Sequence, residues 1–300
     1  MKYKVTHSTT YHYTELVPVC HNRVHLTPRD SLHQTCRQHR LIVKPAPATS
    51  GRRIDYFGNH LTYFSIREGH RKLAVTSMSR VDVRPIVPRE PRDSPPWESV
   101  AEGLRRDLSP QGLEAFQFAF DSPHIRSAPD LAAYASPSLS PGRPLLEGVL
   151  ELMGRIHRDF KYDADATHVH TTLEEVLRIR RGVCQDLAHV QIGCLRSLGL
   201  AARYVSGYLL TAAPPGRPRL VGADASHAWL SVYCGGLGWI DFDPTNDLLP
   251  SEQHITLAWG RDYGDVCPIQ GLFVGGGKHT MHVAVDVTPD DVAVGSPNVQ

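Results

Sequence analysis

The feature that most constrains the fold of this chain is a change of hydrophobic periodicity across a proline-rich stretch, "RPIVPREPRDSPPW", at residues 84–97. Before it, segments such as "KYKVTHSTTYHY" and "KLAVTSMSRVDVRP" alternate apolar and polar residues, which is typical of half-buried strands. After it, apolar residues recur at helical spacing. Because proline disrupts both helices and central strands, neither can run through the stretch. The sequence therefore predicts a β-rich unit and a helix-containing unit joined by a linker.

The predicted organisation has three parts. Residues 1–88 form a β-rich N-terminal accessory domain, a small sandwich or barrel in which Gly58-Asn59 indicates a hairpin turn. Residues 89–145 form a Pro-rich linker with short helices. Residues 146–300 form the main core, which includes a strand in the C-terminal tail, "MHVAVDVTP". Helices followed by strands within one unit indicate an α+β fold.

Three helices are predicted at the start of this core. The first is the amphipathic segment "PLLEGVLELMGRIHRDF". The second, "TTLEEVLRIRRG", has Thr172 and Glu175 at capping-box spacing and Gly182 as its stop. The third begins at Cys184 and ends at Gly199, which suits a left-handed cap. The strands "AARYVSGYLL", "HAWLSVYC" and "GWIDFD" follow. The apolar stripe of the first helix consists of Leu146, Val149, Leu150, Met153, Ile156 and Phe160.

Composition excludes several classes of partner. The formal net charge is +1, with 32 basic and 31 acidic residues, so no strong field draws the chain to nucleic acid or to an anionic membrane. The N-terminal segment is polar and lacks the apolar core of a signal peptide, and we therefore expect a cytoplasmic protein. We expect the scattered cysteines to be reduced thiols. They are Cys20, Cys36, Cys184, Cys194, Cys234 and Cys267.

Cys184 is the candidate nucleophile. A reactive thiol needs a lowered pKa, a base within reach and a group that orients the base. The unpaired N–H groups and the dipole of a helix N-terminus favour a thiolate, and Cys184 lies at such a position. Cys194 lies nearly three turns further along the same helix, where this help is absent. We expect Cys194 and Cys234 to be small buried side chains.

Two further residue types complete a possible catalytic set. His189 is near Cys184 in sequence, but five residues along a helix rotate it by about 140°, so it points away. His227 begins a strand and is preceded by small residues, which makes it the better candidate base. Asp241 and Asp243 share one face of the next strand, which a hairpin at "CGGLG" places antiparallel to the strand of His227. Spacing alone does not separate the two aspartates.

The segments "RRGVCQDLAHVQIGCLRSLGLAARYVSGYL", "SHAWLSVY" and "GWIDFDPTND" resemble the core of the bacterial transglutaminase-like superfamily. The resemblance implies a papain-like core with the nucleophile at a helix N-terminus packed on an antiparallel sheet. It also implies roles for Cys184 as nucleophile, His227 as base and Asp243 as the orienting residue. It favours Asp243 over Asp241 because the family's aspartate precedes a Pro-Thr pair, here Pro244-Thr245.

The resemblance extends to both ends of the chain, through "YKVTHSTTYHYTELV" and "GRDYGDVCPIQGLFVGGGKHTMHVAVDVTP". It implies an acyl-enzyme on Cys184 that reacts with water or with an amine. We expect water, and hence a cysteine peptidase or amidase that acts on a peptide or protein substrate, because water is the ubiquitous acceptor. Transfer to an amine, as in a transglutaminase, and a non-catalytic peptide-binding module are the alternatives. We expect no cofactor, no nucleic-acid partner and no membrane partner. The oligomeric state, the substrate and the role of the β-rich domain stay open.

A metal site is the remaining alternative, because the histidine-rich loop "DADATHVH" departs from the family pattern. Neither this loop nor the tail contains an HExxH motif or the paired cysteines of structural zinc. We therefore interpret both groups as solvated polar residues. The possible ligands are Asp163, Asp165, His168 and His170 in the loop, and His279 and His282 in the tail.

Overall fold

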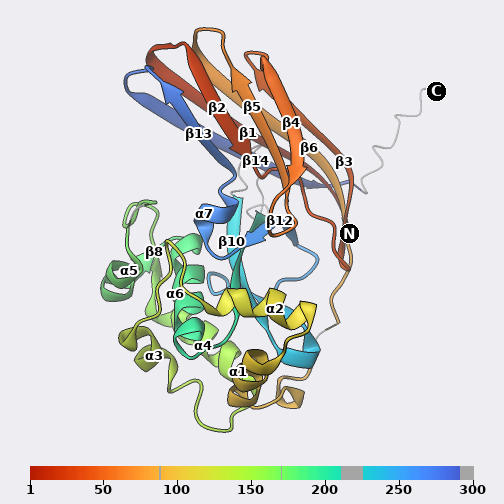
Figure 1. Cartoon of the computed structure of the whole chain (residues 1–300), viewed down its shortest axis with the longest axis vertical. Helices are drawn as coiled ribbons and strands as arrows, with labels where there is room; N and C mark the ends of the chain where they lie inside the picture. Colours follow the sequence, from red (N-terminus) through yellow and green to blue (C-terminus); the bar gives the residue numbers. More distant parts are fainter. Residues whose placement is uncertain (88, 170, 211–225, 291–300) are drawn as a thin grey trace, which may run out of the picture.

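The computed structural model describes residues 1–87, 89–169, 171–210 and 226–290, which form a β-sandwich above a mixed α+β unit (Figure 1). The sandwich consists of two four-stranded sheets, with orders β14-β1-β6-β3 and β13-β2-β5-β4, and every strand pair in them is antiparallel. Its strands are β1 (Lys2–Val17), β2 (Val19–Val24), β3 (Gln34–Lys44), β4 (Thr49–Ile54), β5 (His60–Ile66), β6 (His70–Val83), β13 (Ile269–Val274) and β14 (His279–Pro289).

The second unit is built around an antiparallel sheet of order β11-β10-β9-β12. Helix α6 packs against β9 and β10, and α3, α4 and α5 pack against α6. Its helices are η1 (Pro91–Asp93), α1 (Trp97–Arg106), α2 (Pro110–Phe116), η2 (Gln117–Ala119), α3 (Pro129–Ala135), α4 (Leu145–Asp159), α5 (Leu173–Ile179), α6 (Cys184–Ser197), η3 (Gly235–Leu237) and α7 (Tyr263–Val266). Its strands are β7 (Lys161–Tyr162), β8 (Arg181–Gly182), β9 (Ala202–Leu209), β10 (Ser226–Tyr233), β11 (Trp239–Phe242) and β12 (His254–Gly260).

The local signals in the sequence explain several of these elements. The alternation in the N-terminal segment becomes β1, in which Tyr3 and Val5 are fully buried between polar neighbours. The hairpin predicted at Gly58-Asn59 joins β4 to β5, and Gly58 adopts a positive φ of 77° that glycine accommodates without strain. Gly199 caps α6 with a φ of 79°.

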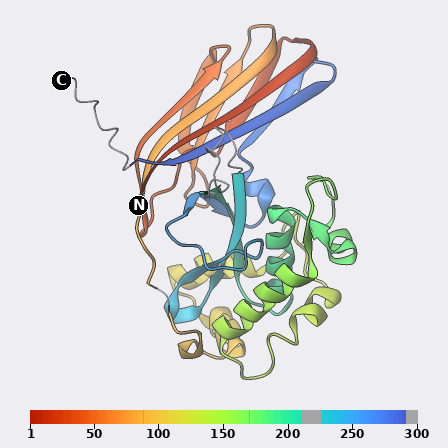
Figure 2. The same cartoon turned by 180° about the vertical axis from the view of Figure 1, so that it is seen from behind.

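The C-terminal tail differs from its predicted assignment to the main core. β14 pairs with β1, and β13 pairs with β2, so both strands complete the sandwich (Figure 2). Alternation in the tail predicted a strand correctly but carried no information about its partner, because strand pairing over this sequence separation depends on tertiary packing. The helices α1–α3 of the predicted linker region also contribute buried side chains to the main unit, including Leu104 and Leu131.

A second difference concerns the end of α5. Its left-handed cap is Arg180, with a φ of 53°, and not the predicted Gly182. Gly182 serves a different purpose, because a Cβ atom there would lie 2.5 Å from Oδ2 of Asp186 in α6. The glycine therefore permits the close approach of β8 to the start of α6.

The two units meet along the free edge of β12. The Gln34 side chain accepts from Thr256 N–H (2.8 Å) and donates to Thr256 C=O (2.7 Å). The Asn59 side chain likewise accepts from Trp259 N–H (3.0 Å) and donates to Trp259 C=O (2.8 Å). Two carboxamides thus replace the missing neighbour strand and satisfy backbone groups that would otherwise stay unpaired.

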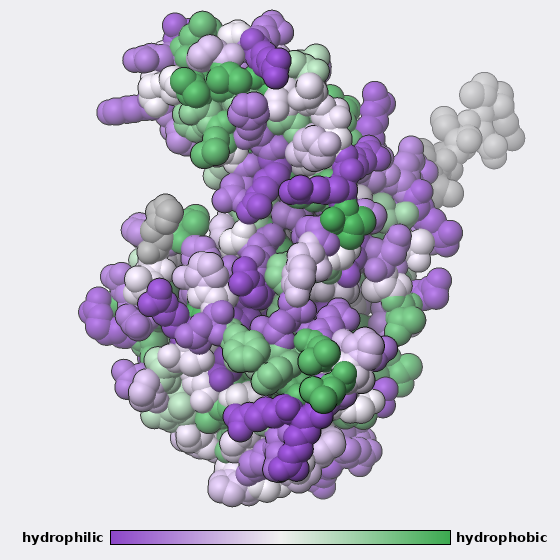
Figure 3. All heavy atoms as spheres, viewed as in Figure 1, coloured by the Kyte–Doolittle hydropathy of each residue, from purple (hydrophilic) through white to green (hydrophobic). Residues whose placement is uncertain are grey.

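On the face drawn in Figure 3, apolar side chains gather near the outer end of the sandwich and around α2. The first group includes Leu272, Val274 and Met281 of β13 and β14, and the second includes Leu113 and Phe120. Within the described ranges, no helix is long and apolar enough to cross a membrane.

The placement of the tail generates a stability prediction. Val285 and Val283 share one face of β14, but Val285 is 1% exposed and Val283 is 41% exposed. Val285→Ala should lower the free energy of unfolding by about 2 kcal/mol because it opens a cavity inside the sandwich. Val283→Ala should change it by less than about 0.5 kcal/mol. Urea unfolding followed by circular dichroism measures both, and equal effects would contradict burial of the tail in the sandwich.

Candidate active site

Cys184 is the first residue of α6, and its position is fixed by Asp186. Oδ2 of Asp186 accepts a hydrogen bond from Val183 N–H (2.8 Å) and another from the Thr167 hydroxyl (2.7 Å). These contacts hold the start of the helix and satisfy one of its orphan donors. The Cys184 thiol is partly buried, while its backbone N–H is one of the first N–H groups of a 14-residue helix. The helix end therefore offers positive potential at this sulfur.

His227 lies near the start of β10 and is 9% exposed. Its Nε2 atom donates to Oδ2 of Asp243 at 2.7 Å, which fixes the orientation of the ring. The Cys184 side chain is the other neighbour that favours its charged form. Because Asp243 occupies Nε2, Nδ1 is the ring nitrogen left for the sulfur. The structure thus brings the three predicted residues into one connected group.

The charge state of His227 follows from these neighbours. Burial by itself lowers the pKa of the imidazole, but hydrogen bonds with Asp243 and Cys184 outweigh it and raise the pKa to about 10. The ring is therefore an imidazolium at neutral pH. It places a positive charge beside the Cys184 side chain.

Asp243 follows β11 and is completely buried. Burial disfavours its charged form, yet hydrogen bonds from His227 and His254 hold the pKa of this carboxyl well below its usual value. Its Oδ1 atom accepts from the backbone N–H groups of Thr245 (3.0 Å) and Asn246 (3.3 Å), in a turn that includes Pro244. The turn keeps the carboxylate pointed at His227.

Asp241 and Asp243 differ in their hydrogen-bond partners. Oδ2 of Asp241 accepts from Trp229 Nε1 at 3.0 Å, on the same sheet face but away from the His227 nitrogen. The hairpin predicted between their strand and that of His227 is present, with Ser231 opposite Asp241. The geometry selects Asp243 as the partner of His227, the choice that spacing alone left open.

Two residues of the site were missed by the sequence analysis. The Asn246 side chain donates to Oδ2 of Asp243 at 2.7 Å, and Nε2 of His254 donates to the same oxygen at 3.1 Å. Asn246 lies in the quoted "DPTND" segment, three residues after the aspartate, where an Asx-type turn was a usable signal. His254 comes from β12, a strand that the sequence analysis did not assign, so nothing local indicated its role.

The other candidate residues lie elsewhere. Cys194 is completely buried, and burial raises the pKa of its thiol to about 12. Cys234 is also completely buried, as predicted. His189 is turned away from Cys184, and its Nε2 atom accepts from the backbone N–H of Tyr263 at 3.2 Å.

The described members of the two possible ligand groups do not form a cluster. In the loop, Asp163 forms an ion pair with Arg181, and His170 lies outside the described residues. In the tail, His279 packs its ring against Phe273. Within the described part of the chain, the only group of three or more such residues whose potential ligand atoms all lie within 4.8 Å of one another is His227, Asp243 and His254. Their mutual contacts are the hydrogen bonds described above.

Comparison with known proteins places this geometry in a family. Residues 3–82 match the bacterial transglutaminase-like N-terminal region, and residues 132–244 match the transglutaminase-like superfamily core. The chain belongs to the transglutaminase-like superfamily, with a β-rich N-terminal region followed by the transglutaminase-like core, as the resemblance predicted.

Its relatives include uncharacterized mycobacterial proteins. One from Mycobacterium tuberculosis (strain ATCC 25618 / H37Rv) is 43% identical and spans 96% of this chain and 93% of its own length. One from Mycobacterium leprae (strain TN) is 34% identical and spans 95% of this chain and 98% of its own length. The crystal structure of a "Putative Cysteine Protease" from Cytophaga hutchinsonii has the same fold, with a TM-score of 0.77 and 22% identity. The match covers 97% of this chain and 91% of that one.

The two aspartates provide a test of the His227 environment. In Asp243→Asn, burial of the ring is no longer offset, so the pKa of His227 should fall and the positive charge beside Cys184 should be lost. Alkylation of Cys184 by iodoacetamide at pH 7 should slow by at least about tenfold. Asp241→Asn, on the same strand face, should change the rate far less. Peptide-resolved mass spectrometry measures the rates, with buried Cys194 as the unreactive reference within the same molecule.

His254 supports a separate prediction on pH. Asp243 has a lowered pKa, so its interactions stabilise the fold above its unfolded pKa of about 3.8 and lose this effect as pH falls through the lower folded value. His254→Phe removes one donor and should cost about 2 kcal/mol at pH 7. The difference in the free energy of unfolding between His254→Phe and the wild type should become smaller below about pH 4. Urea unfolding between pH 3 and pH 7 measures it, and His282→Phe at an exposed position should show no such trend.

Proposed function

We propose that this protein is a thiol-dependent amide hydrolase that cleaves peptide or protein substrates through an acyl-enzyme. In this proposal Cys184 is the nucleophile, His227 transfers the proton and Asp243 orients the imidazole. The observation that carries the proposal is the position of His227, which contacts a thiol at a helix N-terminus on one side and a buried carboxylate on the other. Membership of the transglutaminase-like superfamily supports the same reading.

The reaction follows from the charge distribution. The Cys184 thiolate attacks the amide carbonyl carbon, a C–S bond forms, and the carbonyl oxygen takes up the negative charge. The His227 imidazolium then gives its proton to the amide nitrogen, so the C–N bond breaks and a neutral amine leaves. Water attacks the thioester while His227 takes one of its protons. The C–S bond breaks, and the carboxylic acid product leaves the thiolate paired with the imidazolium again.

Asp243 acts through His227 and not on the substrate. It is buried and has accepted hydrogen bonds on both oxygens, so it has no free oxygen to attack or to bind a substrate. Its charge stabilises the imidazolium and its geometry keeps Nδ1 directed to the sulfur. The same carboxylate therefore both orients the His227 ring and stabilises its positive charge.

The backbone N–H of Cys184 is the natural donor to the developing oxyanion. As the first residue of α6, it has no acceptor four residues earlier within the helix. A donor in this position typically contributes about 3 kcal/mol to transition-state stabilisation. The nucleophile and its oxyanion donor thus belong to one residue, and Asp186 and Gly182 fix the position of both.

Water and amines compete for the same acyl-enzyme. The residues that form the thioester do not distinguish the two acceptors, because the outcome depends on access to the bound acyl group. We favour hydrolysis because water is always present at high concentration. Amine transfer, as in a transglutaminase, and peptide binding without reaction are the competing outcomes.

The proposal is tested by mass spectrometry of a peptide library incubated with the protein, with and without added primary amines. Cleaved peptides that appear with the wild type and are absent with Cys184→Ala are the expected result. Deamidation or amine incorporation would instead identify glutamine side chains as the acyl donors. Each reaction changes the peptide mass differently, so a single data set separates them.

Cys194→Ala is the matched control, because it removes a thiol from the same helix without touching the site. It should retain the full product profile of the wild type. Products that persist in Cys184→Ala, or no product with any library peptide and any amine, would contradict the enzymatic proposal. Retention of peptides on a column of the unreactive protein would then favour the binding module.

A further inference from the structure

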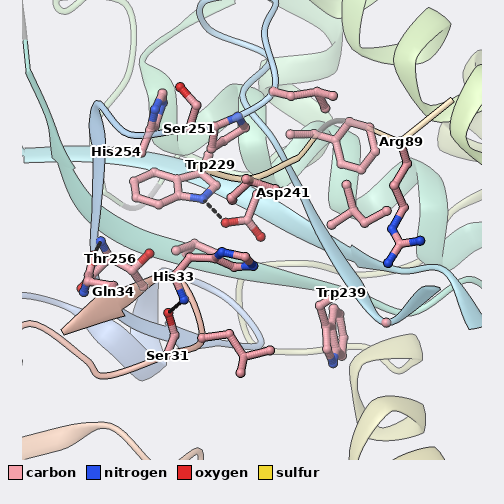
Figure 4. Close-up of a pocket in the computed structure, with 18 of the residues that line it drawn as sticks. Ser31, His33, Gln34, Arg89, Trp229, Trp239, Asp241, Ser251, His254 and Thr256 are labelled. Carbon is pink, nitrogen blue, oxygen red and sulfur yellow. Dashed lines mark hydrogen bonds between the residues drawn. The ribbon is translucent and has the colours of Figure 1, made fainter. Parts of the chain in front are cut away.

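A large cavity lies on the face of the β11-β10-β9-β12 sheet that is turned away from α6 (Figure 4). The Tyr204 ring packs 5.0 Å from the ring of His189 in α6, so its neighbours on β9, Arg203 and Val205, point to the opposite face. The cavity has a volume of about 960 Å³ and is closed by residues 83–87 of the linker and residues 31–34 of the sandwich. Val83 of this lining is the last residue of β6, and Arg84 begins the proline-rich stretch, so the cavity is formed by the sheet, the sandwich and that stretch together.

Arg203 is a buried cation in the wall of this cavity. The side chain is 7% exposed, and its guanidinium carbon lies 4.2 Å from the ring centre of Trp239 and 3.8 Å from that of Trp259. The aromatic rings stabilise the faces of the guanidinium but accept no hydrogen bond in its plane. Its Nε atom has no hydrogen-bond partner among the described residues. Burial lowers the pKa of Arg203 to about 9, so the group keeps its charge at neutral pH.

The remainder of the lining favours an anion with an apolar body. Among the described residues that line the cavity there are three arginines, Arg84, Arg89 and Arg203, and one carboxylate, Asp241, which already accepts from the Trp229 indole. Between these groups the wall is apolar. Its apolar side chains include Leu146, Leu150, Val205, Trp229, Phe242 and Leu249. Sites for small organic molecules have this character, a mostly apolar cavity with a few charged groups that orient the ligand.

We propose that this cavity is a binding site for an organic carboxylate with an aliphatic or aromatic body, whose carboxylate pairs with Arg203. The planar guanidinium donates in a fork that matches the two oxygens of a carboxylate. The apolar body of the ligand occupies the space beside Trp229 and Leu150. Within the described residues Arg203 has no hydrogen bond or ring contact with Cys184 or His227, although His254, which donates to Asp243, also lines the cavity. The proposal therefore does not depend on whether the protein hydrolyses amides.

The chain supplies its own reporter for this site. Of its four tryptophans, Trp229, Trp239 and Trp259 line the cavity, and only Trp97 does not. Decanoate and its uncharged analogue decanamide, neither of which absorbs with tryptophan, are titrated into the full chain. Decanoate should shift the tryptophan fluorescence saturably, at one molecule per chain, and bind at least about tenfold tighter than decanamide. Calorimetry with 2-naphthoate and 2-naphthamide tests an aromatic body in the same way.

Two variants distinguish recognition of the ligand's charge from nonspecific hydrophobic binding. Arg203→Gln should bind decanoate and decanamide equally, whereas Arg203→Lys, which keeps the charge but loses the fork, should show an intermediate preference. Arg126→Gln, an exposed arginine outside the cavity, is the matched control and should behave as the wild type. An unchanged preference for decanoate in Arg203→Gln would overturn the proposal, as would failure of both carboxylates to bind the wild type more tightly than their amides.

A variant at the cavity rim tests the proposal independently, in case a substitution of buried Arg203 prevents folding. Arg89 is exposed, so Arg89→Glu should not disturb the core. It places a negative charge at the rim and should weaken decanoate several-fold while decanamide binds as before. Equal affinities of Arg89→Glu and the wild type for decanoate, at low ionic strength, would count against an anion in this cavity.

Discussion

The site depends on one buried ion, the carboxylate of Asp243. An uncompensated carboxylate in a fully buried position would be protonated or would destabilise the fold, so it must be surrounded by donors. The donors come from three separate segments: His227 at the start of β10, Asn246 in the turn after β11, and His254 at the start of β12. β11 and β12 are the outer strands of the sheet, about 14 Å apart in a flat sheet. The hydrogen bond between Asp243 and His254 therefore requires a sheet that curls at this end, as well as long side chains that bridge the remaining gap.

The β-sandwich takes part in holding this sheet. Among the described strands, β12, which carries His254, has no neighbour on its outer side, and an edge of that kind leaves backbone groups without partners. Gln34 and Asn59 of the sandwich supply those partners through their side-chain amides. The Arg29 guanidinium, 3.5 Å from the centre of the Trp259 ring, lies beside the same edge. The same contact region borders the cavity of Arg203. The accessory region is thus part of the framework that positions His254, and through it Asp243.

Local patterns predicted the local structure, and long-range packing decided the rest. The start of α6 at Cys184, its end at Gly199 and the hairpin before β11 follow from capping and turn preferences over a few residues. His254 was not predictable in this way, because its role comes from the curl of a sheet and not from its neighbours in sequence. Gln34 and Asn59 are polar residues in or beside turns, and their role depends on a strand more than 190 residues away. The tail strands show the same limit, since alternation predicts a strand and leaves its partner undetermined.

The order of the strands has a consequence for how the two units depend on each other. The chain leaves the sandwich after β6, builds the whole α+β unit, and returns as β13 and β14 at the edges of the two sandwich sheets. Without this return, β1 and β2 would be open edges. Pairing of β14 with β1 joins the two ends of the described chain, and closing so long a loop costs conformational entropy unless the intervening residues are already compact. Folding of the α+β unit therefore lowers the cost of completing the sandwich, while the completed sandwich supplies the amides that close the edge of β12. The two units stabilise each other, which explains why one apolar core includes buried residues from both.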